Sequence, residues 1–451
     1  MPTMRIVELP AKRYYTDRGS AERLRPVAQQ VLEPLVTALT SPLTPEEANP
    51  EDKGPGVDET IKISADNYEL ALEKLNELYL NNKWSDGLPI VAPTPDRVKW
   101  ILSGTNRSPE EVVGTAKPKN GIATIEKIAI NAAMAGAKPE YLPVIITAME
   151  ALTDKNYDAL HVMLSSGSFN LIIAVSGPIG KEIKMNSGIG YLGYGYRANS
   201  TIGRAVRLSM INLGYLWPAD NDMALVGRAS SHTFFTFAEN QEANPWDPYH
   251  VTQGFKPEDS CVTVATVGGY GGSAGSQYGG GAVGIWDAER ILQQIVDDIR
   301  RSGRSSMRMW AGGVGPTPGS GGAASKQFIL MMPELAIELE RLGYTPEKLQ
   351  NYIVEKSAVP YEELKPEEAA AVKEAIEVGY IPAYRAPVFK EALKRGGKVP
   401  IVIEPKDINI FVVGGFPGYT LRMSYYRVAP YAPTAHQVRR IHGAALTEAG
   451  R

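Results

Sequence analysis

The stretch NLIIAVSGPIGKEIKMNSGIGYLGYGYRANSTIGRAVR, residues 170–207, carries the main signal for the fold. Its apolar, β-branched start, Leu171 to Val175, ends abruptly at Ser176-Gly177-Pro178. A series of glycines follows, and Asn199-Ser200-Thr201 then indicates the start of an amphipathic helix. This order predicts a buried strand, a glycine-rich loop and a helix. Open α/β sheets bind ligands at such a strand end, because backbone N–H groups and a helix N-terminus meet there.

The composition is that of an ordinary globular protein. Of the 451 residues, 43% are hydrophobic and 22% are charged, and the length allows two or three domains. The net charge of −3 lacks the basic excess that favours nucleic acid, so we expect no nucleic-acid partner. The longest nearly apolar stretch, Tyr141 to Leu152, is too short to cross a bilayer, and the N-terminus lacks an apolar signal core. We therefore expect a cytoplasmic protein with no membrane partner.

Cysteine and histidine usage argues against a metal centre. Cys261 is the single cysteine, which excludes a disulfide within the chain and disfavours a cysteine-based metal site. The five histidines form no HxH or HExxH spacing, so we expect no metal site. Cys261 lies in a predicted strand, where a lone cysteine is usually a small core residue rather than a nucleophile. The sequence specifies no cofactor.

Apolar runs that end in Gly-Gly or Gly-Pro alternate with helical patterns in the second part of the chain. The runs lie at 171–178, 262–269, 307–316 and 408–415. The helical patterns lie at 202–213, 288–301, 326–342 and 366–378. Three of the four runs are nearly continuously apolar, as in strands that are covered on both faces. The alternation predicts an α/β fold: a helical N-terminal portion, then a mainly parallel sheet with glycine-rich loops at its strand ends.

Changes in pattern along the chain predict three parts: an N-terminal arm and linker (1–58), a mainly helical domain (59–160) and an α/β domain (161–451). The arm contains a predicted helix from Arg23 to Leu39, and Thr60 to Ser64 is predicted to form a short strand. The similar strand ends favour two pseudo-repeated halves of the last part, about 161–304 and 305–451.

The glycine-rich loop at 186–204 is the first candidate site. Glycines let the backbone approach a ligand closely, and arginine binds carboxylate or phosphate through two parallel contacts. We predict that Arg197 and Arg204 hold an anion, with hydrogen bonds from Asn186, Ser187 and Asn199. The loop matches neither the P-loop nor the dinucleotide-binding pattern, so nucleotide binding is only weakly indicated. The alternative is a loop that packs against a second subunit.

The segment FTFAENQEANPWDPYHVTQGF, residues 235–255, is the second candidate site. Glu239 follows an apolar run directly, and His250 lies eleven residues later. Acids beside an imidazole can form an acid–base pair or a mixed metal site. We predict Glu239 and His250 as the acid–base residues. The alternative is a solvated loop that is anchored by Trp246.

Five segments together carry a resemblance to a known family: DGLPIVAPTPDRV (86–98), ATIEKIAINAAMAGAKPEYLPVI (123–145), SGPIGKEIKMNSG (176–188), YRANSTIGRAVRL (196–208) and FAENQEANPWDPYHV (237–251). Through them, roughly residues 60–440 resemble a largely uncharacterised bacterial family that is similar to the larger companions of small proteins with a UGSC-type selenocysteine or cysteine motif. The resemblance assigns no reaction. This chain has no UGSC or CGSC motif of its own, so any thiol chemistry implies a separate Cys- or Sec-containing subunit.

These observations favour an enzyme, or the large subunit of a heteromeric enzyme, that acts on a small anionic substrate. The reaction would be redox chemistry or C–X bond cleavage with a partner thiol, or a proton transfer of the lyase type. We also expect a homo-oligomer, since the arm and the glycine loops suit subunit contacts. The alternative is a non-catalytic scaffold protein that self-assembles through the same loops.

Overall fold

The computed structural model describes residues 21–45, 60–157, 159–166, 169–227, 230–274, 287–311, 326–379, 381–415, 425–430 and 436–444. The chain divides into two compact units, Met1–Asn67 and Tyr68–Arg451. The boundary that we predicted at residue 160 falls inside the second unit and stays a prediction. Most of the linker predicted before residue 59 lies outside the described residues.

The described part of the first unit is mainly one helix. The helix predicted from Arg23 to Leu39 is present as α2 (Ala21–Thr40), with Pro26 and Pro34 inside it. Among its described side chains, Leu32, Leu35, Val36 and Leu39 are exposed, with Leu39 at 76%. The short strand predicted at 60–64 is wrong, because residues 60–65 have no strand partner and form coil.

Helices and a small hairpin form the first layer of the second unit: α4 (Tyr68–Asn81), α5 (Pro95–Leu102), β1 (Val112–Ala116), β2 (Gly121–Thr124), α6 (Ile125–Met134), η1 (Pro139–Tyr141), α7 (Leu142–Leu152), α8 (Ala159–Leu164) and α10 (Arg197–Gly214). The predicted helix start at Thr124 is confirmed, since the Thr124 hydroxyl accepts the N–H of Lys127 at 3.3 Å. The alanine-rich face of α6 is buried, and its small side chains allow α10 to pack closely beside it.

A seven-stranded sheet forms the centre of the second unit. Six strands lie in the order β4-β3-β5-β10-β6-β9, and β11 pairs with β5: β3 (Asn170–Ser176), β4 (Phe235–Ala238), β5 (Cys261–Ala274), β6 (Gln327–Met331), β9 (Ile408–Val412), β10 (Tyr425–Pro430) and β11 (Gln437–Arg440). Among the described strands of this sheet, the pairs β3/β4 and β6/β9 are the parallel ones. The other pairs are antiparallel, so the prediction of a mainly parallel sheet is wrong. An apolar run shows that both faces of a strand are covered, but not the direction of its neighbours.

The sheet curls until its two edge strands meet. The N–H of Asn240, just after β4, donates to the carbonyl of Val412 in β9 at 2.8 Å. The rings of Phe237 and Phe411 pack edge to face across this seam, with centroids 5.8 Å apart. The concave face encloses its own apolar core: Ile172, Ala174, Phe235, Phe237, Tyr249, Ala265, Val267, Phe328, Leu330, Phe411 and Val413. This core covers the inner face of the strands, which explains their continuous apolar sequence.

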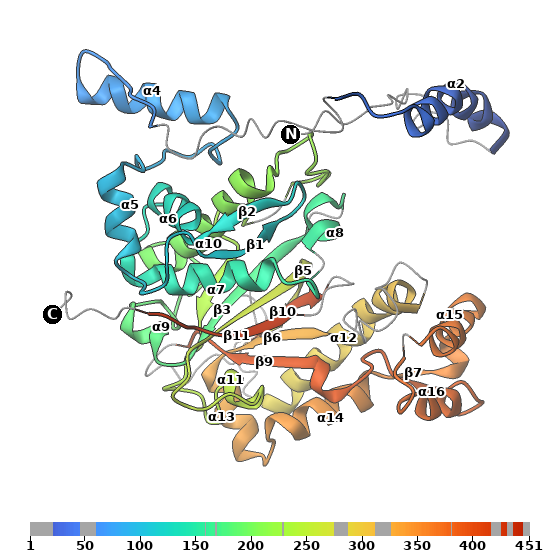
Figure 1. The fold of residues 1–451 in the computed structure, drawn as a ribbon. Helices are drawn as coiled ribbons and strands as arrows, with labels where there is room; N and C mark the ends of the chain where they lie inside the picture. The colour runs from blue at the N-terminus through green and yellow to red at the C-terminus, as the bar shows by residue number, and fades with distance from the viewer. Residues whose placement is uncertain are drawn as a thin grey trace. The chain divides into compact units, whose positions relative to one another are not determined.

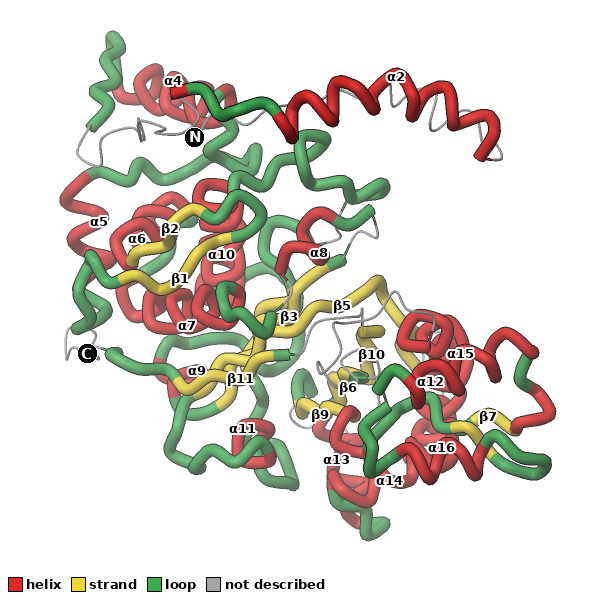
Figure 2. The backbone as a smooth tube through the Cα atoms, turned by 45° about the vertical axis from the view of Figure 1, so that its right-hand side comes forward, coloured by secondary structure: helices red, strands yellow, loops and turns green. Residues whose placement is uncertain are grey.

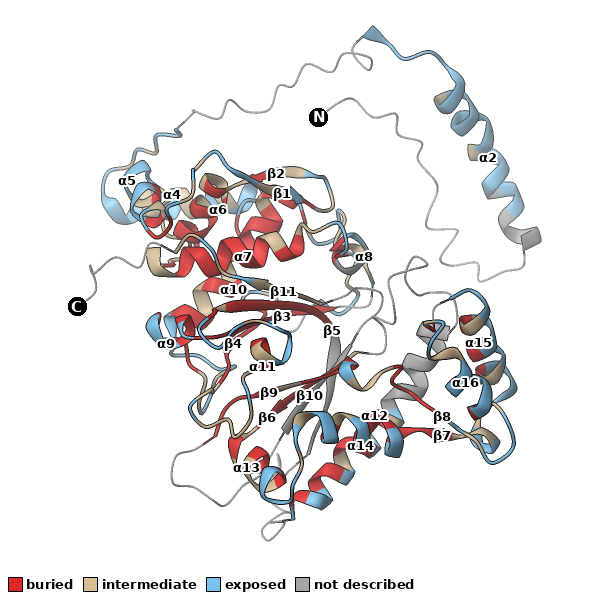
Figure 3. Ribbon diagram, turned by 60° about the horizontal axis from the view of Figure 1, so that its bottom comes forward, coloured by how far each residue is buried: buried red, intermediate tan, exposed pale blue. Residues whose placement is uncertain are grey.

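Two groups of helices cover the outer face of the curled sheet. Outward residues of β3 and β5 pack against α6, α7 and α10, while those of β6 and β9 pack against α12 (Ala288–Ala311), α13 (Pro333–Arg341) and α14 (Pro346–Ser357). Figure 1 shows these two groups on opposite sides of the strands. Figure 3 shows that the described strands β3, β6 and β9 are buried nearly throughout.

The two halves of the sheet share one strand order. In each half a first strand pairs in parallel with a second and antiparallel with a third, as β3, β4 and β5 do, and then β6, β9 and β10. The third strands pair with each other at the centre. In Figure 2, β3 and β5 lie together, and β6, β9 and β10 form a neighbouring group. The predicted pseudo-repeat and its residue boundaries stay a prediction.

Of the remaining elements, α9 (Ile179–Glu182) follows β3 directly and packs in the core of the first half. The others are α11 (Tyr249–Thr252), β7 (Val359–Pro360), η3 (Tyr361–Glu363), α15 (Pro366–Glu377), α16 (Ala386–Ala392), β8 (Lys398–Val399) and η4 (Pro405–Asp407). The apolar run predicted as a strand from 307 instead begins inside α12, because a short apolar run does not distinguish a buried helix from a strand. The helix predicted at 326–342 starts only at Pro333, after β6. None of the helices that the structure describes is long and apolar enough to cross a membrane.

Candidate functional site

Arg197 lies at the start of α10, two residues before the predicted helix start. Its side chain is exposed, and Nε donates to the carbonyl of Gly136 at 2.9 Å. Asn199 therefore lies inside the helix instead of capping it, which corrects the predicted boundary. The described contacts tie Arg197 to the loop after α6, and its role in anion binding stays a prediction.

The Asn199 side chain holds the glycine-rich loop against the sheet. Its Oδ1 accepts the N–H of Asn186 at 2.8 Å, and its Nδ2 donates to the Asn186 carbonyl at 3.0 Å. The Asn186 side chain in turn donates to the carbonyl of Ile189. The carbonyl of Ser187 accepts the N–H of Gly414 at 2.7 Å, which links the loop to the end of β9. The structure thus brings Asn186, Ser187 and Asn199 together, and these contacts fix the loop.

Arg204 forms a two-pronged ion pair with Asp86. Its Nε and one terminal nitrogen lie 2.8 and 2.9 Å from the two carboxylate oxygens, and the same nitrogen donates to two nearby carbonyls. The Asp86 side chain is only 3% exposed. Burial raises the pKa of Asp86, but the hydrogen bonds and charge of Arg204 outweigh it, so the pKa lies below its ordinary value. Arg204 therefore anchors an acid rather than a ligand.

Glu239 lies at the carboxyl end of β4, as predicted, and is buried. Both of its carboxylate oxygens lie 3.0 Å from the N–H of Tyr249 at the start of α11, and the Asn244 side chain donates to Oε1 at 3.3 Å. Burial raises the pKa of Glu239 to about 7, against the lowering influence of Ser176, Tyr249 and Asn244. This carboxyl holds the 240–249 loop and can also exchange a proton near neutral pH.

His250 is fully buried beside Tyr249, but its ring faces another loop. Its Nε2 lies 3.4 Å from the carbonyl of Pro257, and Asp259 is the nearby acid. Burial lowers the pKa of His250, so that the neutral ring is favoured. No described contact joins the His250 ring to Glu239, so the structure does not support the predicted acid–base pair.

Tyr249 joins the two halves of the sheet through a buried polar network. The Asn409 side-chain nitrogen donates to the carbonyls of Gln327 and Asp407, so its Oδ1 accepts the Tyr249 hydroxyl proton at 2.8 Å. The His436 Nε2, 3.0 Å from the same hydroxyl, must then be the donor in that contact. Burial lowers the pKa of His436 to about 3, which keeps this ring neutral.

The raised pKa of Glu239 gives a testable pH dependence. Between its ordinary value of 4.5 and about 7, the folded protein holds a proton on Glu239 that the unfolded chain releases. Ionisation of Glu239 should therefore lower the free energy of unfolding by about 3 kcal/mol as pH rises from 4.5 to about 7. Glu239→Gln cannot ionise and should lack this loss. Chemical denaturation of both proteins at pH 5 and pH 7.5 measures the difference.

Glu242→Gln is the matched control, because Glu242 lies in the same loop, is exposed and pairs with Lys181. The free energy of unfolding of Glu242→Gln should depend on pH nearly as that of wild type does. If wild type and Glu239→Gln lose the same free energy of unfolding between pH 5 and pH 7.5, the pKa of Glu239 is not raised.

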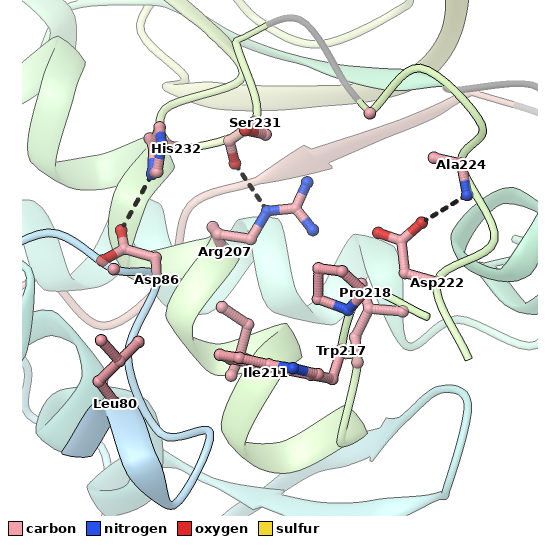
Figure 4. A pocket seen from close by; sticks show the side chains of 13 residues that line it. Leu80, Asp86, Arg207, Ile211, Trp217, Pro218, Asp222, Ala224, Ser231 and His232 are labelled. Atoms are coloured by element: carbon pink, nitrogen blue, oxygen red, sulfur yellow. Dashed lines mark hydrogen bonds and ion pairs between the residues drawn. The ribbon is translucent and has the colours of Figure 1, made fainter. Parts of the chain in front are cut away.

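A pocket of about 360 Å³ opens beside α10 in the helical layer and is called here the Arg207 pocket. Its volume lies within the usual range of small-molecule sites. Figure 4 shows the Arg207 guanidinium pointing into it from the helix. The lining residues are Leu80, Asp86, Gly87, Arg207, Ile211, Leu216, Trp217, Pro218, Asp222, Ala224, Gly227, Ser231 and His232.

Asp86 and His232 lie next to each other on the wall of the Arg207 pocket. The Nδ1 of His232 lies 3.5 Å from the Asp86 carboxylate, and the His232 side chain is 47% exposed (Figure 4). Arg204 and the N–H of Leu88 hold that carboxylate in place. A fixed acid beside a partly exposed imidazole selects the ring orientation and tautomer, as in catalytic acid–histidine pairs.

The turn that carries His232 is held in a constrained backbone conformation. Ser230 and Phe234 both have a φ of +54°, which non-glycine residues seldom adopt. Thr233 packs so closely on α10 that a Cβ at Gly203 would lie 1.7 Å from the Thr233 carbonyl oxygen. Such strain often accompanies functional sites, since the surrounding structure must enforce it.

Arg207 is buried on the same helix, one turn after Arg204. Its Nε donates to the carbonyl of Ser231 at 2.7 Å, and its guanidinium lies 4.4 Å from the centre of the Phe234 ring. These contacts orient a permanent positive charge at the pocket. The turn at 230–234 thus positions both His232 and Arg207.

Sequence reasoning did not select Asp86, Arg207 and His232 as site residues. In the sequence, Asp86-Gly87 is only a turn signal, and Arg207 is one charged residue of an amphipathic helix. One signal was available, because Arg207 occupies a position of α10 where its neighbours Val206, Leu208 and Ile211 are apolar and buried. A charged residue on a buried face is retained for a partner or a ligand.

Comparisons with protein-family models, curated proteins and solved structures found no match to this chain. The resemblance to the companions of UGSC-motif proteins therefore stays a prediction. Among the residues that the structure describes, no group of three or more His, Cys, Asp and Glu side chains is placed to hold a metal ion. Cys261 is buried in β5, and burial raises the pKa of its thiol to about 12.

Proposed function

We propose that this chain is an enzyme, or the large subunit of a heteromeric enzyme, that acts on a small anionic substrate in the Arg207 pocket. The observation that supports it best is the Asp86–His232 pair on the wall of a pocket that a buried arginine also lines. General acid–base catalysis needs an oriented imidazole within reach of bound substrate. Neither Glu239 nor His250 lines this pocket, so His232 replaces them as the acid–base residue.

In this proposal Arg207 binds the anionic group of the substrate. A guanidinium has five N–H donors, so it can contact a carboxylate alongside Ser231 and Phe234. His232 takes a proton from the substrate or returns one, and Asp86 stabilises the imidazolium that forms. Arg204 keeps Asp86 ionised and in place. A proton transfer of the lyase type is the chemistry that these side chains supply.

Thiol chemistry would need a group from outside this chain. Cys261 is fully buried, and a thiol with a pKa of about 12 is almost entirely protonated at neutral pH. If the reaction uses a thiol, a partner subunit supplies it, in line with the resemblance to companions of UGSC-motif proteins.

A metabolite extract of the source cells tests the proposed function. Wild type and His232→Gln are incubated separately with the extract, and mass spectrometry follows every small anion over time. Wild type should consume at least one anion that His232→Gln leaves unchanged, because glutamine cannot act as a general base. The same extract with and without a purified Cys- or Sec-containing partner tests the heteromeric form.

His442→Gln is the control, since His442 is exposed and does not line the pocket. It should consume the same anion at the rate of wild type. If no anion is consumed, or if His232→Gln consumes it as fast as wild type, the pocket is not catalytic through His232. A self-assembling scaffold would then be the better interpretation, and the exposed loop residues Ile189 and Tyr194 would be its first candidate contacts.

A further inference from the structure

The 240–249 loop bridges the two halves of the curled sheet at one end. The Gln241 side chain accepts the N–H of Gly177, just after β3, at 3.1 Å. Trp246 packs against the core of the second half, and its indole nitrogen donates to the carbonyl of Tyr344 at 3.1 Å. The loop therefore contacts both halves next to the seam that closes the sheet.

Glu239 holds this loop from the inside. It is 6% exposed, and its oxygens accept the N–H of Tyr249 and the side-chain amide of Asn244. The Ser176 hydroxyl, in a residue that is 1% exposed, lies beside the same carboxyl and has no other hydrogen-bond partner in the described part of the chain. A neutral carboxyl suits this set, because its O–H can donate to Ser176 while the other oxygen accepts an N–H.

The groups around Glu239 give it no positive charge. The titratable side chains on the surrounding elements are Lys181, Glu182, Lys184, Glu242, Asp247, Tyr249, His250, Lys256, Asp259, Cys261 and Glu334. No described contact joins a cation among them to the Glu239 carboxyl, and Lys181 pairs instead with Glu242 at the surface. Burial keeps the His250 ring neutral, while burial and the charge of Glu239 raise the pKa of Tyr249. An ionised Glu239 is therefore a buried charge that only neutral donors solvate, which is costly.

We propose that Glu239 is a latch that a proton operates. While the carboxyl is neutral, its hydrogen bonds hold the 240–249 loop closed. When the carboxyl ionises, the buried charge favours an open form in which the loop lifts and water reaches the carboxylate. The latch is a regulatory device of the fold, and it does not depend on the proposed function.

Linkage between the proton and the loop sets the direction of the switch. Burial raises the pKa of Glu239 to about 7 in the closed form, whereas a solvated carboxyl in the open form keeps its ordinary value of 4.5. The closed form therefore binds the proton more tightly. The latch is fully effective below pH 4.5 and is lost as pH rises through about 7.

Hydrogen exchange followed by mass spectrometry at pH 5.5 and pH 8.0 tests the latch, with rates corrected for the intrinsic pH dependence of exchange. In wild type, the protection of peptides that cover the 240–249 loop should fall roughly 25-fold between the two pH values. The core helix α7 is the internal reference for opening of the whole protein. At pH 8.0 the loop should be at least about tenfold less protected than α7, because it opens locally.

Two variants separate the latch from other effects of pH. Glu239→Gln keeps an acceptor for Tyr249 and a donor for Ser176 but cannot ionise. Its loop should retain at pH 8.0 the protection that it has at pH 5.5. Glu242→Gln is the matched control, because it removes an exposed acid of the same loop. Its loop should lose protection as that of wild type does.

A wild-type loop that is as strongly protected as α7 at pH 8.0 would overturn the latch, because the carboxyl would then meet water only when the whole protein unfolds. The same loss of protection in wild type and Glu239→Gln would also overturn it. If Glu239→Gln does not fold, the wild-type measurement decides alone, and a loss in the loop of less than about threefold contradicts the proposal. The proposed function fails by a different result, the absence of His232-dependent consumption in the extract.

Discussion

Replacing Asp86 by alanine should lower the free energy of unfolding by about 3–5 kcal/mol. Asp86 and Arg204 are almost fully buried, with 3% and 14% of their side chains exposed. Alanine leaves the Arg204 guanidinium without its carboxylate, and an uncompensated buried charge is far more costly than a broken surface pair. The same change removes the acid that orients His232. Urea denaturation at pH 7 measures the stability, and the extract assay measures the catalytic consequence.

Asp220→Ala is the matched control for this experiment. Asp220 also pairs with a cationic side chain, Lys83, but both partners are about half exposed. Solvent screens such a pair, so its loss should cost less than about 1 kcal/mol. If Asp86→Ala loses no more free energy of unfolding than Asp220→Ala, the buried Asp86–Arg204 pair contributes no more to stability than an exposed pair.

Gly203→Ala should destabilise the protein, although helix propensity alone predicts the opposite. Within a helix, alanine is more favourable than glycine by about 1 kcal/mol. At Gly203, however, the added Cβ would lie 1.7 Å from the carbonyl oxygen of Thr233 and 2.4 Å from Oγ1 of Thr236. The turn must move away from α10, and such overpacking costs about 1–3 kcal/mol or more. Thermal and urea unfolding measure the sign, and the His232 ring resonances report the displacement.

Gly188→Ala serves as the control, because the nearest atom to its added Cβ, Oδ1 of Asn186, lies at an ordinary 3.7 Å. It should change the stability by less than about 1 kcal/mol. A Gly203→Ala protein that is as stable as wild type, with unshifted His232 resonances, would show that the turn at 230–236 does not need this close approach. The proposed positioning of His232 by α10 would then be wrong.

The local pattern of apolar and capping residues predicted several helices and strands correctly. The strand at 170–176, the helix that begins after Thr124 and the helix within 366–378 were all readable, because each has a clear apolar period or a capping residue. The run from 307 and the segment from 326 were misread, since short apolar stretches fit a strand and a buried helix equally well.

The candidate site could not be predicted from the sequence as the individual elements were, because its residues come from segments that lie far apart in the chain. Asp86 follows α4, Arg207 lies on α10 and His232 lies in the turn before β4. The sequence favours Arg197 as the anion-binding residue, because Arg204 lies a full turn inside the predicted helix, where it can pair with an acid. The structure separates their roles, since Arg204 meets a buried carboxylate from a segment more than a hundred residues earlier.

The order of residues along the chain thus specified several individual elements, such as the strand at 170–176 and the helix that begins after Thr124, and a core setting for the single cysteine. These properties depend on backbone preferences and on solvation of side chains over a few residues. Strand direction, the closure of the sheet at Asn240 and Val412, and the meeting of Asp86, Arg207 and His232 depended on tertiary structure. They depend on contacts between segments that are distant in the sequence. These contacts stabilise the protein only when the whole core has packed.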